Sequence, residues 1–401
     1  MIPLNSNIEQ KINHYLLLCF AFAFPISVAI GNLILGLILI NFLIFGNIKI
    51  KIGKILENKL AIAAIIFFLI HLISILWTEN IDWGITILKK MIDFIIVLPV
   101  FLVLVNSNFK SKYINIFLSS IFLSSFLSYM VHFEFIEPFH RATTSNPTPT
   151  MSHISFPVFL VMAFYTAFSI LMKENGLALY YKAWLWILIS MKSINIFIIG
   201  GRTGQILFLF SLFLIFIEYF RSKFRLSLTI LLFTPIFILL MVNFSQNFNK
   251  RIDQTIKSID SIMNMNDRHT SIGQRYDFFL NSLDIIKANP ILGVGVGDFP
   301  DEYEKIRIIK NRPSYVKTVN PHNMYILILA QLGIFGLISL IYLLFVQYKI
   351  SRNNSSYLRN IGRALPLFFS IIMLSDSYLL GHFTTMLFVF FSGILYSNKH
   401  I

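Results

Sequence analysis

Length, composition and charge exclude several classes of protein. The chain has 401 residues, of which 56% are hydrophobic and only 13% are charged, and its mean hydropathy is +0.72. Soluble globular proteins average about 45–50% apolar and about 25% charged residues, so the composition predicts an integral membrane protein. The net charge of +14 does not indicate a nucleic-acid partner, because the basic residues lie in short connections between apolar runs.

Potential metal ligands are few and dispersed. The single cysteine, Cys19, lies inside the first apolar run, which excludes an intramolecular disulfide and a thiolate metal cage. The nine histidines are scattered along the chain, and no two have the spacing of a metal site on a helix. We therefore expect neither a metal ion nor another cofactor.

Apolar runs predict an all-α fold of about twelve transmembrane helices. A bilayer core about 30 Å thick requires about 20 mostly apolar residues per helix. Suitable runs occupy residues 15–30, 31–47, 60–77, 84–105, 113–131, 152–172, 180–200, 203–220, 225–245, 322–348, 360–378 and 381–397.

The basic residues predict the orientation of these helices. Lysine and arginine gather in cytoplasmic loops, and here they gather in the even-numbered connections, such as 48–59, 106–112, 221–225 and 349–363. The odd connections "TENIDWG" and "DSYLLGH" contain neither residue. Both termini are therefore predicted to be cytoplasmic, with the odd connections outside.

One long connection divides the chain into three parts. Residues 1–245 hold the first nine predicted helices, residues 246–321 form the connection, and residues 322–401 hold the last three. Because it follows the ninth helix, the connection is predicted to lie on the external face. Its basic and acidic residues nearly balance, so it would be translocated because of its length.

The long connection is predicted to be folded. Isoleucines at steps of four, three and three predict one amphipathic helix at about 249–263, and apolar residues from Ile272 to Ile286 predict a second that stops at Asn289-Pro290. The following "ILGVGVGDFP" lacks the spacing and the flanking elements of a dinucleotide fingerprint. A close backbone approach beside a ligand and an ordinary turn remain open for it, and the segment after it is polar and mobile in character.

Five charged or titratable residues are candidates for a functional site: Lys89, Lys90, Arg202, Arg275 and His322. Arginine near the bilayer is costly unless it is paired or solvated, although snorkelling to headgroups is the structural alternative. A lone interfacial histidine is more often structural than catalytic. Together these residues predict an external pocket, at the level of the membrane, that binds a lipid-linked phosphate or pyrophosphate.

The chain resembles the O-antigen ligases of the O-antigen ligase and polymerase superfamily of bacterial membrane glycosyltransferases. The resemblance rests on the helix pattern with a late external loop, and on "GGRTGQ", "GQRYDFFLNSLDIIKANPILGVGVGDF" and "PHNMYILILAQLG". Phe279 stands where the family often has leucine, four residues after the loop arginine, and it keeps the apolar contact.

The resemblance implies an activity and a place in the cell. A glycosyltransferase of the bacterial inner membrane would move a polysaccharide from undecaprenyl pyrophosphate onto the lipid A core at the periplasmic face, without a metal ion or nucleotide. His322 would be the catalytic base, and Arg202 and Arg275 would hold the pyrophosphate and stabilise the leaving group. Lys89 and Lys90 are weaker candidates for binding the same pyrophosphate. The reaction would invert the anomeric centre.

Three other functions remain open. An O-antigen polymerase uses a similar donor but typically has two sizeable basic external loops, whereas the other external loop here has one arginine, Arg141. A protein O-oligosaccharyltransferase of the same superfamily tends to have a longer C-terminal region. A transporter predicts internal repeats and helices broken near the middle of the membrane, and the sequence shows no convincing repeat.

Overall fold

A computed structural model describes residues 6–140, 142–220, 253, 256–257, 260, 270–312, 318–354 and 356–397. Within these residues the chain is helical, with one isolated β-bridge between Thr143 and Asn146 and no strand. Five of the described helical segments are long and apolar enough to cross a membrane: Lys59–Trp77, Ser107–His132, Phe156–Lys173, Arg202–Tyr219 and Met324–Ser351. The predicted all-α class is confirmed, and the count of twelve spans stays a prediction.

The first predicted pair of helices is shifted toward the N-terminus. Helix α1 covers Ser6–Ala23 and α2 covers Val28–Ile44, whereas the hydropathy placed them at 15–30 and 31–47. Pro25 cannot continue a helix, and the Ser27 side chain caps α2 by accepting a hydrogen bond from the Ile30 N–H. The connection predicted at 48–59 contains another helix, α3 (Ile48–Glu57), before α4 (Lys59–Ile73).

The run at 84–105 was predicted to be one helix, and this prediction was wrong. The structure has α5 (Ile81–Met91), a short 3₁₀ turn and α6 (Val97–Leu104). Pro99 explains the interruption because it lacks the N–H that would bond the carbonyl one turn earlier, and a proline is tolerated in the first turn of a new helix.

The next four helices agree with the hydropathy to within a few residues. They are α7 (Lys110–His132), α8 (Phe156–Lys173), α9 (Leu179–Ile198) and α10 (Arg202–Ile215). The predicted ninth helix, 225–245, lies outside the described residues. So does nearly all of the amphipathic helix predicted at 249–263.

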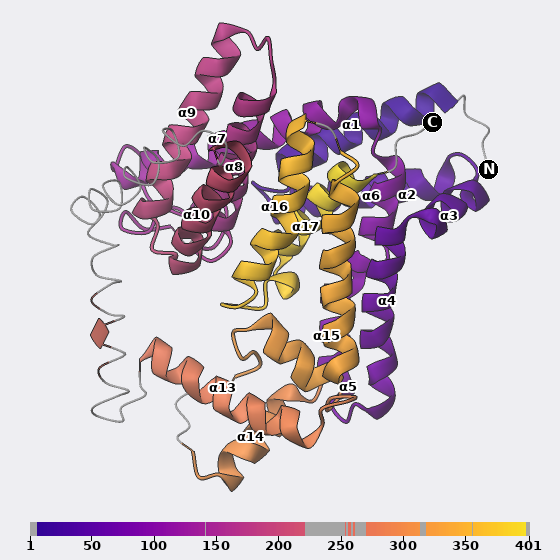
Figure 1. Ribbon diagram of the computed structural model, residues 1–401, viewed down its shortest axis with the longest axis vertical. Coiled ribbons are helices and arrows are strands. Elements are labelled where there is room, and N and C mark those ends of the chain that lie inside the picture. The colour runs from indigo at the N-terminus through magenta and orange to yellow at the C-terminus, as the bar shows by residue number, and fades with distance from the viewer. Residues whose placement is uncertain are drawn as a thin grey trace.

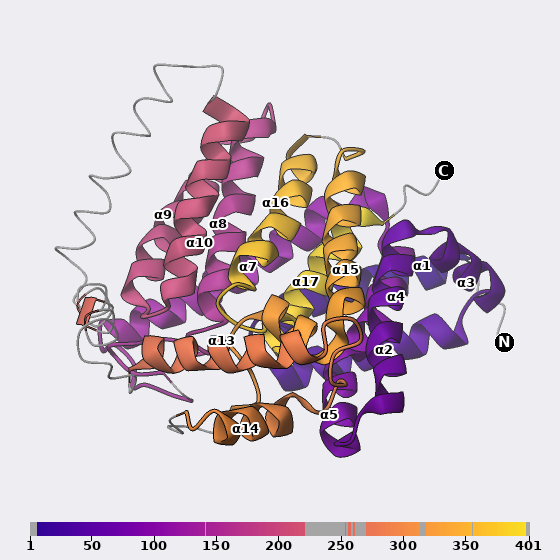
Figure 2. The same cartoon turned by 60° about the horizontal axis from the view of Figure 1, so that its bottom comes forward.

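The described part of the long connection contains two helices and a small core of its own. Helix α13 (Ser271–Ala288) confirms the second amphipathic helix, whereas α14 (Phe299–Ile309) was not predicted. Figures 1 and 2 show both helices lying across one end of the helical bundle, next to the start of α15. Buried side chains join them there: Phe278, Ile285, Phe299, Tyr303, Leu327 and Ala330.

The last three helices are α15 (Met324–Ser351), α16 (Ser356–Ile372) and α17 (His382–Tyr396). Helix α15 packs along α4 and α16, and α17 packs on α6 (Figure 1). At Gly333 the backbone leaves the helical region, with φ 61° and ψ −157°. The helical hydrogen-bond ladder of α15 is therefore interrupted at this residue.

The glycine-rich turn 293–297 attaches the long connection to this break in α15. The N–H groups of Val294 and Gly295 donate to the carbonyls of Ala330 and Gln331, each at 2.9 Å. A Cβ on Gly293 would lie 2.3 Å from the carbonyl carbon of Gln331. The glycines therefore allow a close approach between two backbone segments of the protein, the turn and α15.

Candidate functional site

The N-terminus of α10 forms one wall of a candidate site on the side of the bundle where α13 lies. Gly201 precedes the helix and provides no side-chain cap, and the dipole of α10 favours an anion at this end. The preceding glycines and Gly204 permit this geometry, because a Cβ on Gly204 would lie 2.1 Å from the Pro157 Cβ in α8. The motif "GGRTGQ" thus packs the start of α10 tightly against α8.

Arg202 and Arg275 line the same cavity, although 73 residues separate them in the chain. We name it the arginine cavity; its volume is about 230 Å³, and its other walls include Thr203, Ser375, Asp376 and Tyr378. Arg275 lies in the second turn of α13, whose first turn is capped by the Thr270 hydroxyl accepting from the Gly273 N–H at 3.1 Å. Two guanidinium groups and a helix N-terminus all favour an anionic ligand here.

His322 lies next to Asp376, one wall of this cavity, and is held there by contacts on several sides. Its backbone is in the left-handed region, with φ 55°, and the Asn320 side chain fixes that turn by accepting from the His322 N–H at 2.9 Å. The imidazole stacks on Phe278 with ring centroids 5.9 Å apart. Because Phe278 follows Arg275 by one turn of α13, the same helix positions both residues.

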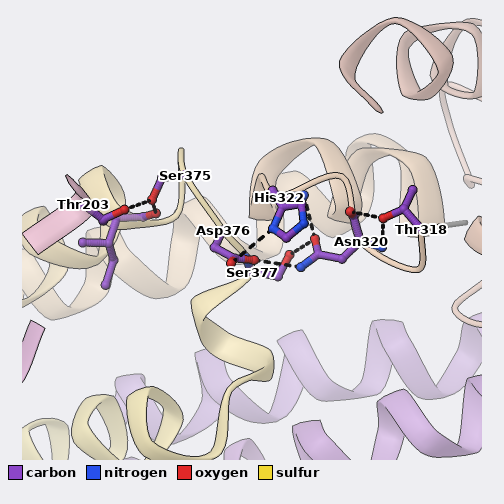
Figure 3. Close-up of polar contacts among 8 residues, drawn as sticks. Thr203, Thr318, Asn320, His322, Ser375, Asp376 and Ser377 are labelled. Atoms are coloured by element: carbon purple, nitrogen blue, oxygen red, sulfur yellow. Dashed lines mark hydrogen bonds and ion pairs between the residues drawn. The ribbon is translucent and has the colours of Figure 1, made fainter. Parts of the chain in front are cut away.

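His322 and Asp376 form a pair that resembles the base and its orienting carboxylate in many hydrolases. The distance from His322 Nδ1 to Asp376 Oδ2 is 3.3 Å, and Figure 3 shows the imidazole directed toward this carboxylate. The histidine side chain is 36% exposed while Nδ1 is buried. The exposure therefore lies on the rest of the ring, which leaves Nε2 as the nitrogen able to meet a substrate.

A hydrogen-bond network holds Asp376 in its ionised form. The Asn320 amide donates to Oδ1 at 2.8 Å, and the Ser377 N–H donates to the same oxygen at 2.7 Å (Figure 3). Burial by itself would raise the pKa of Asp376, but these contacts and His322 outweigh it and hold the pKa below its usual value. The carboxylate can therefore stabilise a positive charge on His322.

The connection that carries Asp376 is fixed to two helices. Thr203 at the start of α10 and Ser375 share a hydrogen bond of 2.9 Å between their hydroxyls, drawn in Figure 3. At the other side, the Met324 N–H donates to the Met373 carbonyl at 2.8 Å. Burial raises the pKa of the neighbouring Tyr378, so its phenol stays protonated at neutral pH.

Asp376 is the functional candidate that sequence reasoning missed. The segment "DSYLLGH" lacks lysine and arginine, which predicts an external connection, and it also contains an acid directly after an apolar run. An acidic residue at the external end of a membrane helix is a usable signal. Its partner could not be identified from the sequence, since 54 residues separate it from His322.

Lys89 and Lys90 lie apart from the two arginines. Both border a cavity of about 420 Å³ together with Asp93 and His382, which we name the lysine cavity. Lys90 also borders a third cavity, of about 290 Å³, which contains Trp83 and reaches Asp376. We name this the tryptophan cavity. The structure thus brings Arg202, Arg275 and His322 together around Asp376, and places the lysines in other cavities.

These features define the class of protein: an all-helical membrane chain with a basic, histidine-containing site at one end of its bundle. Residues 184–341 match a family model described as O-antigen ligase, which is less than half of the chain but includes Arg202, Arg275 and His322. The match confirms the resemblance to the O-antigen ligase family, whose members are membrane glycosyltransferase-like enzymes. A comparison with curated proteins found no match.

Proposed function

We propose that this protein is an O-antigen ligase, which transfers a polysaccharide from undecaprenyl pyrophosphate to a hydroxyl of the lipid A core at the periplasmic face of the inner membrane. One observation carries the proposal: Asp376 borders the cavity of Arg202 and Arg275 and also contacts His322. An anion-binding group and a candidate base therefore meet at one place, as a transfer from a pyrophosphate donor requires.

In this proposal the arginine cavity binds the pyrophosphate. Arg202, Arg275 and the first N–H groups of α10 stabilise the negative charge that develops as the bond from the sugar to the pyrophosphate breaks. Arginine suits this role because its guanidinium stays charged and can bond phosphate through two N–H groups. A charge-assisted hydrogen bond contributes about 1.5–3 kcal/mol, so loss of one arginine contact should slow transfer at least about tenfold.

His322 acts as the general base. Asp376 accepts from the Nδ1–H and so keeps the lone pair on Nε2, which takes the proton of the acceptor hydroxyl as its oxygen attacks the anomeric carbon. The bond from that carbon to the pyrophosphate oxygen breaks on the opposite face, and the proton remains on His322 until it passes to solvent. A single displacement of this kind inverts the anomeric centre. None of these steps requires a metal ion, so we expect activity in excess chelator.

The experiment that tests the function is deletion of the gene in its host, followed by electrophoresis of the lipopolysaccharide. For a ligase, capped lipid A core disappears and long glycan accumulates on the lipid carrier. Accumulation of single repeat units would instead identify a polymerase, and unchanged lipopolysaccharide would contradict both. Unglycosylated host proteins with normal lipopolysaccharide would indicate a protein O-oligosaccharyltransferase.

Complementation of the deletion tests the assigned site. Arg275→Ala should fail to restore capped lipopolysaccharide, because the pyrophosphate loses one of its two proposed arginine contacts. Expression should stay at the wild-type level, since Arg275 lies on an exposed face of α13 and the helix does not need it for packing. Arg352→Ala is the matched control, since Arg352 is also exposed but lies in the connection after α15. Full complementation by Arg275→Ala would remove the arginine cavity from the proposal.

A further inference from the structure

The tryptophan cavity shares a wall with the arginine cavity but is chemically different. Asp376, Tyr378 and Ile154 border both cavities. Beyond them, the arginine cavity contains two guanidinium groups, whereas the tryptophan cavity contains an indole and one ammonium group. Most of its other polar groups are neutral: the amide of Asn320 and the hydroxyls of Ser152, Ser155, Ser377 and Thr384.

Two side chains of this cavity remain available to a ligand. The indole Nε1 of Trp83 is buried and has no hydrogen-bond partner among the described residues, which is costly unless a ligand or water accepts from it. The Lys90 ammonium lies over the indole, 5.8 Å from the ring centroid. An aromatic face beside several hydroxyls fits a sugar ring, and an adjacent cation fits a negatively charged substituent on that sugar.

The geometry of a single displacement indicates which substrate occupies the tryptophan cavity. In a single displacement the attacking oxygen and the leaving oxygen lie on opposite sides of the anomeric carbon, and the reacting atoms must be held about 3–3.5 Å apart. If the pyrophosphate occupies the arginine cavity, the acceptor has to approach the anomeric carbon from the side opposite that cavity. Asp376 borders both cavities and contacts His322, so the tryptophan cavity offers the acceptor a place next to the base and outside the pyrophosphate site.

We infer that the tryptophan cavity is the acceptor subsite, in which Trp83 contacts a sugar ring and Lys90 binds an anionic substituent of the acceptor, such as a phosphate or carboxylate. This inference rests on the proposed function and assigns Lys90 to the acceptor, in place of the pyrophosphate contact predicted for it from the sequence. It also gives Lys89 no part in binding either the acceptor or the pyrophosphate, because Lys89 borders the lysine cavity and neither the tryptophan cavity nor the arginine cavity.

Binding to the purified full-length protein in nanodiscs tests the inference. Two ligands are titrated separately: core-only lipopolysaccharide, and undecaprenyl pyrophosphate. We expect Lys90→Gln and Trp83→Phe each to weaken binding of the core lipopolysaccharide about fivefold or more and to leave binding of undecaprenyl pyrophosphate unchanged. Lys89→Gln is the matched control and should change neither. Chemical dephosphorylation of the core, repeated on wild type and Lys90→Gln, shows whether phosphate or carboxylate is the substituent.

The possible outcomes separate this inference from the proposed function. Weaker binding of undecaprenyl pyrophosphate by Lys90→Gln would place the donor in the tryptophan cavity and overturn the inference. Unchanged binding of both ligands in Lys90→Gln and Trp83→Phe would also overturn it, while a loss of pyrophosphate binding in Arg275→Ala would leave the proposed function intact. A wild-type protein that binds neither ligand would contradict the function, and the acceptor subsite with it.

Discussion

The described part of the connection between α10 and α15 has two regions that differ in how they meet the bundle. In residues 289–301, which we name the anchor, the glycines and Asp298 are buried against other backbone segments. In the first turns of α13, Arg275, Tyr276 and Phe279 are exposed, and Phe278 is buried and stacks on His322. The anchor fixes the position of the connection, and α13 presents side chains to the site.

This difference changes how the motifs of the connection are interpreted. The glycine-rich motif is the more conspicuous in the sequence, yet its contacts are with Gln331, Thr78 and Asn80 of the same chain. The single arginine of "GQRYDFF" is less conspicuous and borders the arginine cavity. Substitutions in the anchor should therefore reduce stability, and substitutions in the site should reduce activity while the protein remains folded.

The largest expected effect is the loss of activity in His322→Asn. Asparagine tolerates the left-handed backbone conformation of this position better than alanine does, so the turn is preserved while the base is lost. General base catalysis contributes about 10²–10⁴ in rate, and glycan transfer from undecaprenyl pyrophosphate should fall by that factor. The measurement is initial rate in membranes adjusted to equal protein content.

The control for this substitution is His132→Asn. His132 ends α7 and its Nδ1 contacts the Thr144 carbonyl at 3.0 Å, away from the three cavities, so its loss should leave the rate near wild type. If His322→Asn retained the wild-type rate, His322 would have a structural role only. A parallel fall in thermal midpoint and rate would likewise indicate a structural role for His322.

The second expected effect is a loss of stability in Gly333→Ala. The backbone conformation of Gly333, φ 61° and ψ −157°, is essentially restricted to glycine and costs a residue with a side chain about 1–3 kcal/mol, and the added Cβ would lie 2.1 Å from the Ile291 carbonyl oxygen. Shifting that backbone costs about 1–3 kcal/mol more. The thermal midpoint in detergent should fall clearly. Gly36→Ala in α2 is the control, because a Cβ there meets nothing within 4 Å, and an unchanged midpoint in both variants would contradict the anchor.

Much of the helical fold could be predicted from the sequence, and the errors of that prediction have local causes. Hydropathy located most of the membrane helices because their apolar runs are long, but it measures composition and not hydrogen bonding. Hydropathy therefore predicted one continuous helix across the interruption before Pro99, and it did not detect the helix boundary at Pro25. The helix at Phe299–Ile309 was missed because its charged surface resembles a polar loop, while Phe299 and Tyr303 provide its buried contacts.

The candidate site was predictable in part. Arg202, Arg275 and His322 could be identified singly, because each is a polar group in an unusual position or carries a family motif. Their grouping around Asp376 depends on the packing of α13 against α15 and on the hydrogen bond between Thr203 and Ser375. Contacts between distant segments of this kind leave no local pattern in one sequence. For the same reason, the sequence predicts that Lys89 or Lys90 faces a polar cavity, but it does not show which cavity Lys90 borders.

The smallest of the three expected effects is a loss of stability in Asp298→Asn. Asp298 joins the anchor to the connection between α4 and α5 by hydrogen bonds. Its two carboxylate oxygens accept from the N–H groups of Asn80 at 2.7 Å and Glu79 at 2.9 Å. In Asp298→Asn one of these buried N–H groups would face an amide NH₂, at a cost of about 1–3 kcal/mol. We expect a lower thermal midpoint with little change in the rate measured below it.

Asp301→Asn is the matched control for Asp298→Asn. Asp301 is one turn further along and exposed, and it accepts from the Asn80 side chain at 2.7 Å and not from a backbone N–H among the described residues. A substitution at such an exposed position usually changes stability by less than about 0.5 kcal/mol. Equal midpoints for the two variants would show that the anchor does not depend on this pair of backbone contacts. A loss of rate in Asp298→Asn without a change in thermal midpoint would instead show that the functional site extends into the anchor. The division of the connection into a structural region and a functional region would then be wrong.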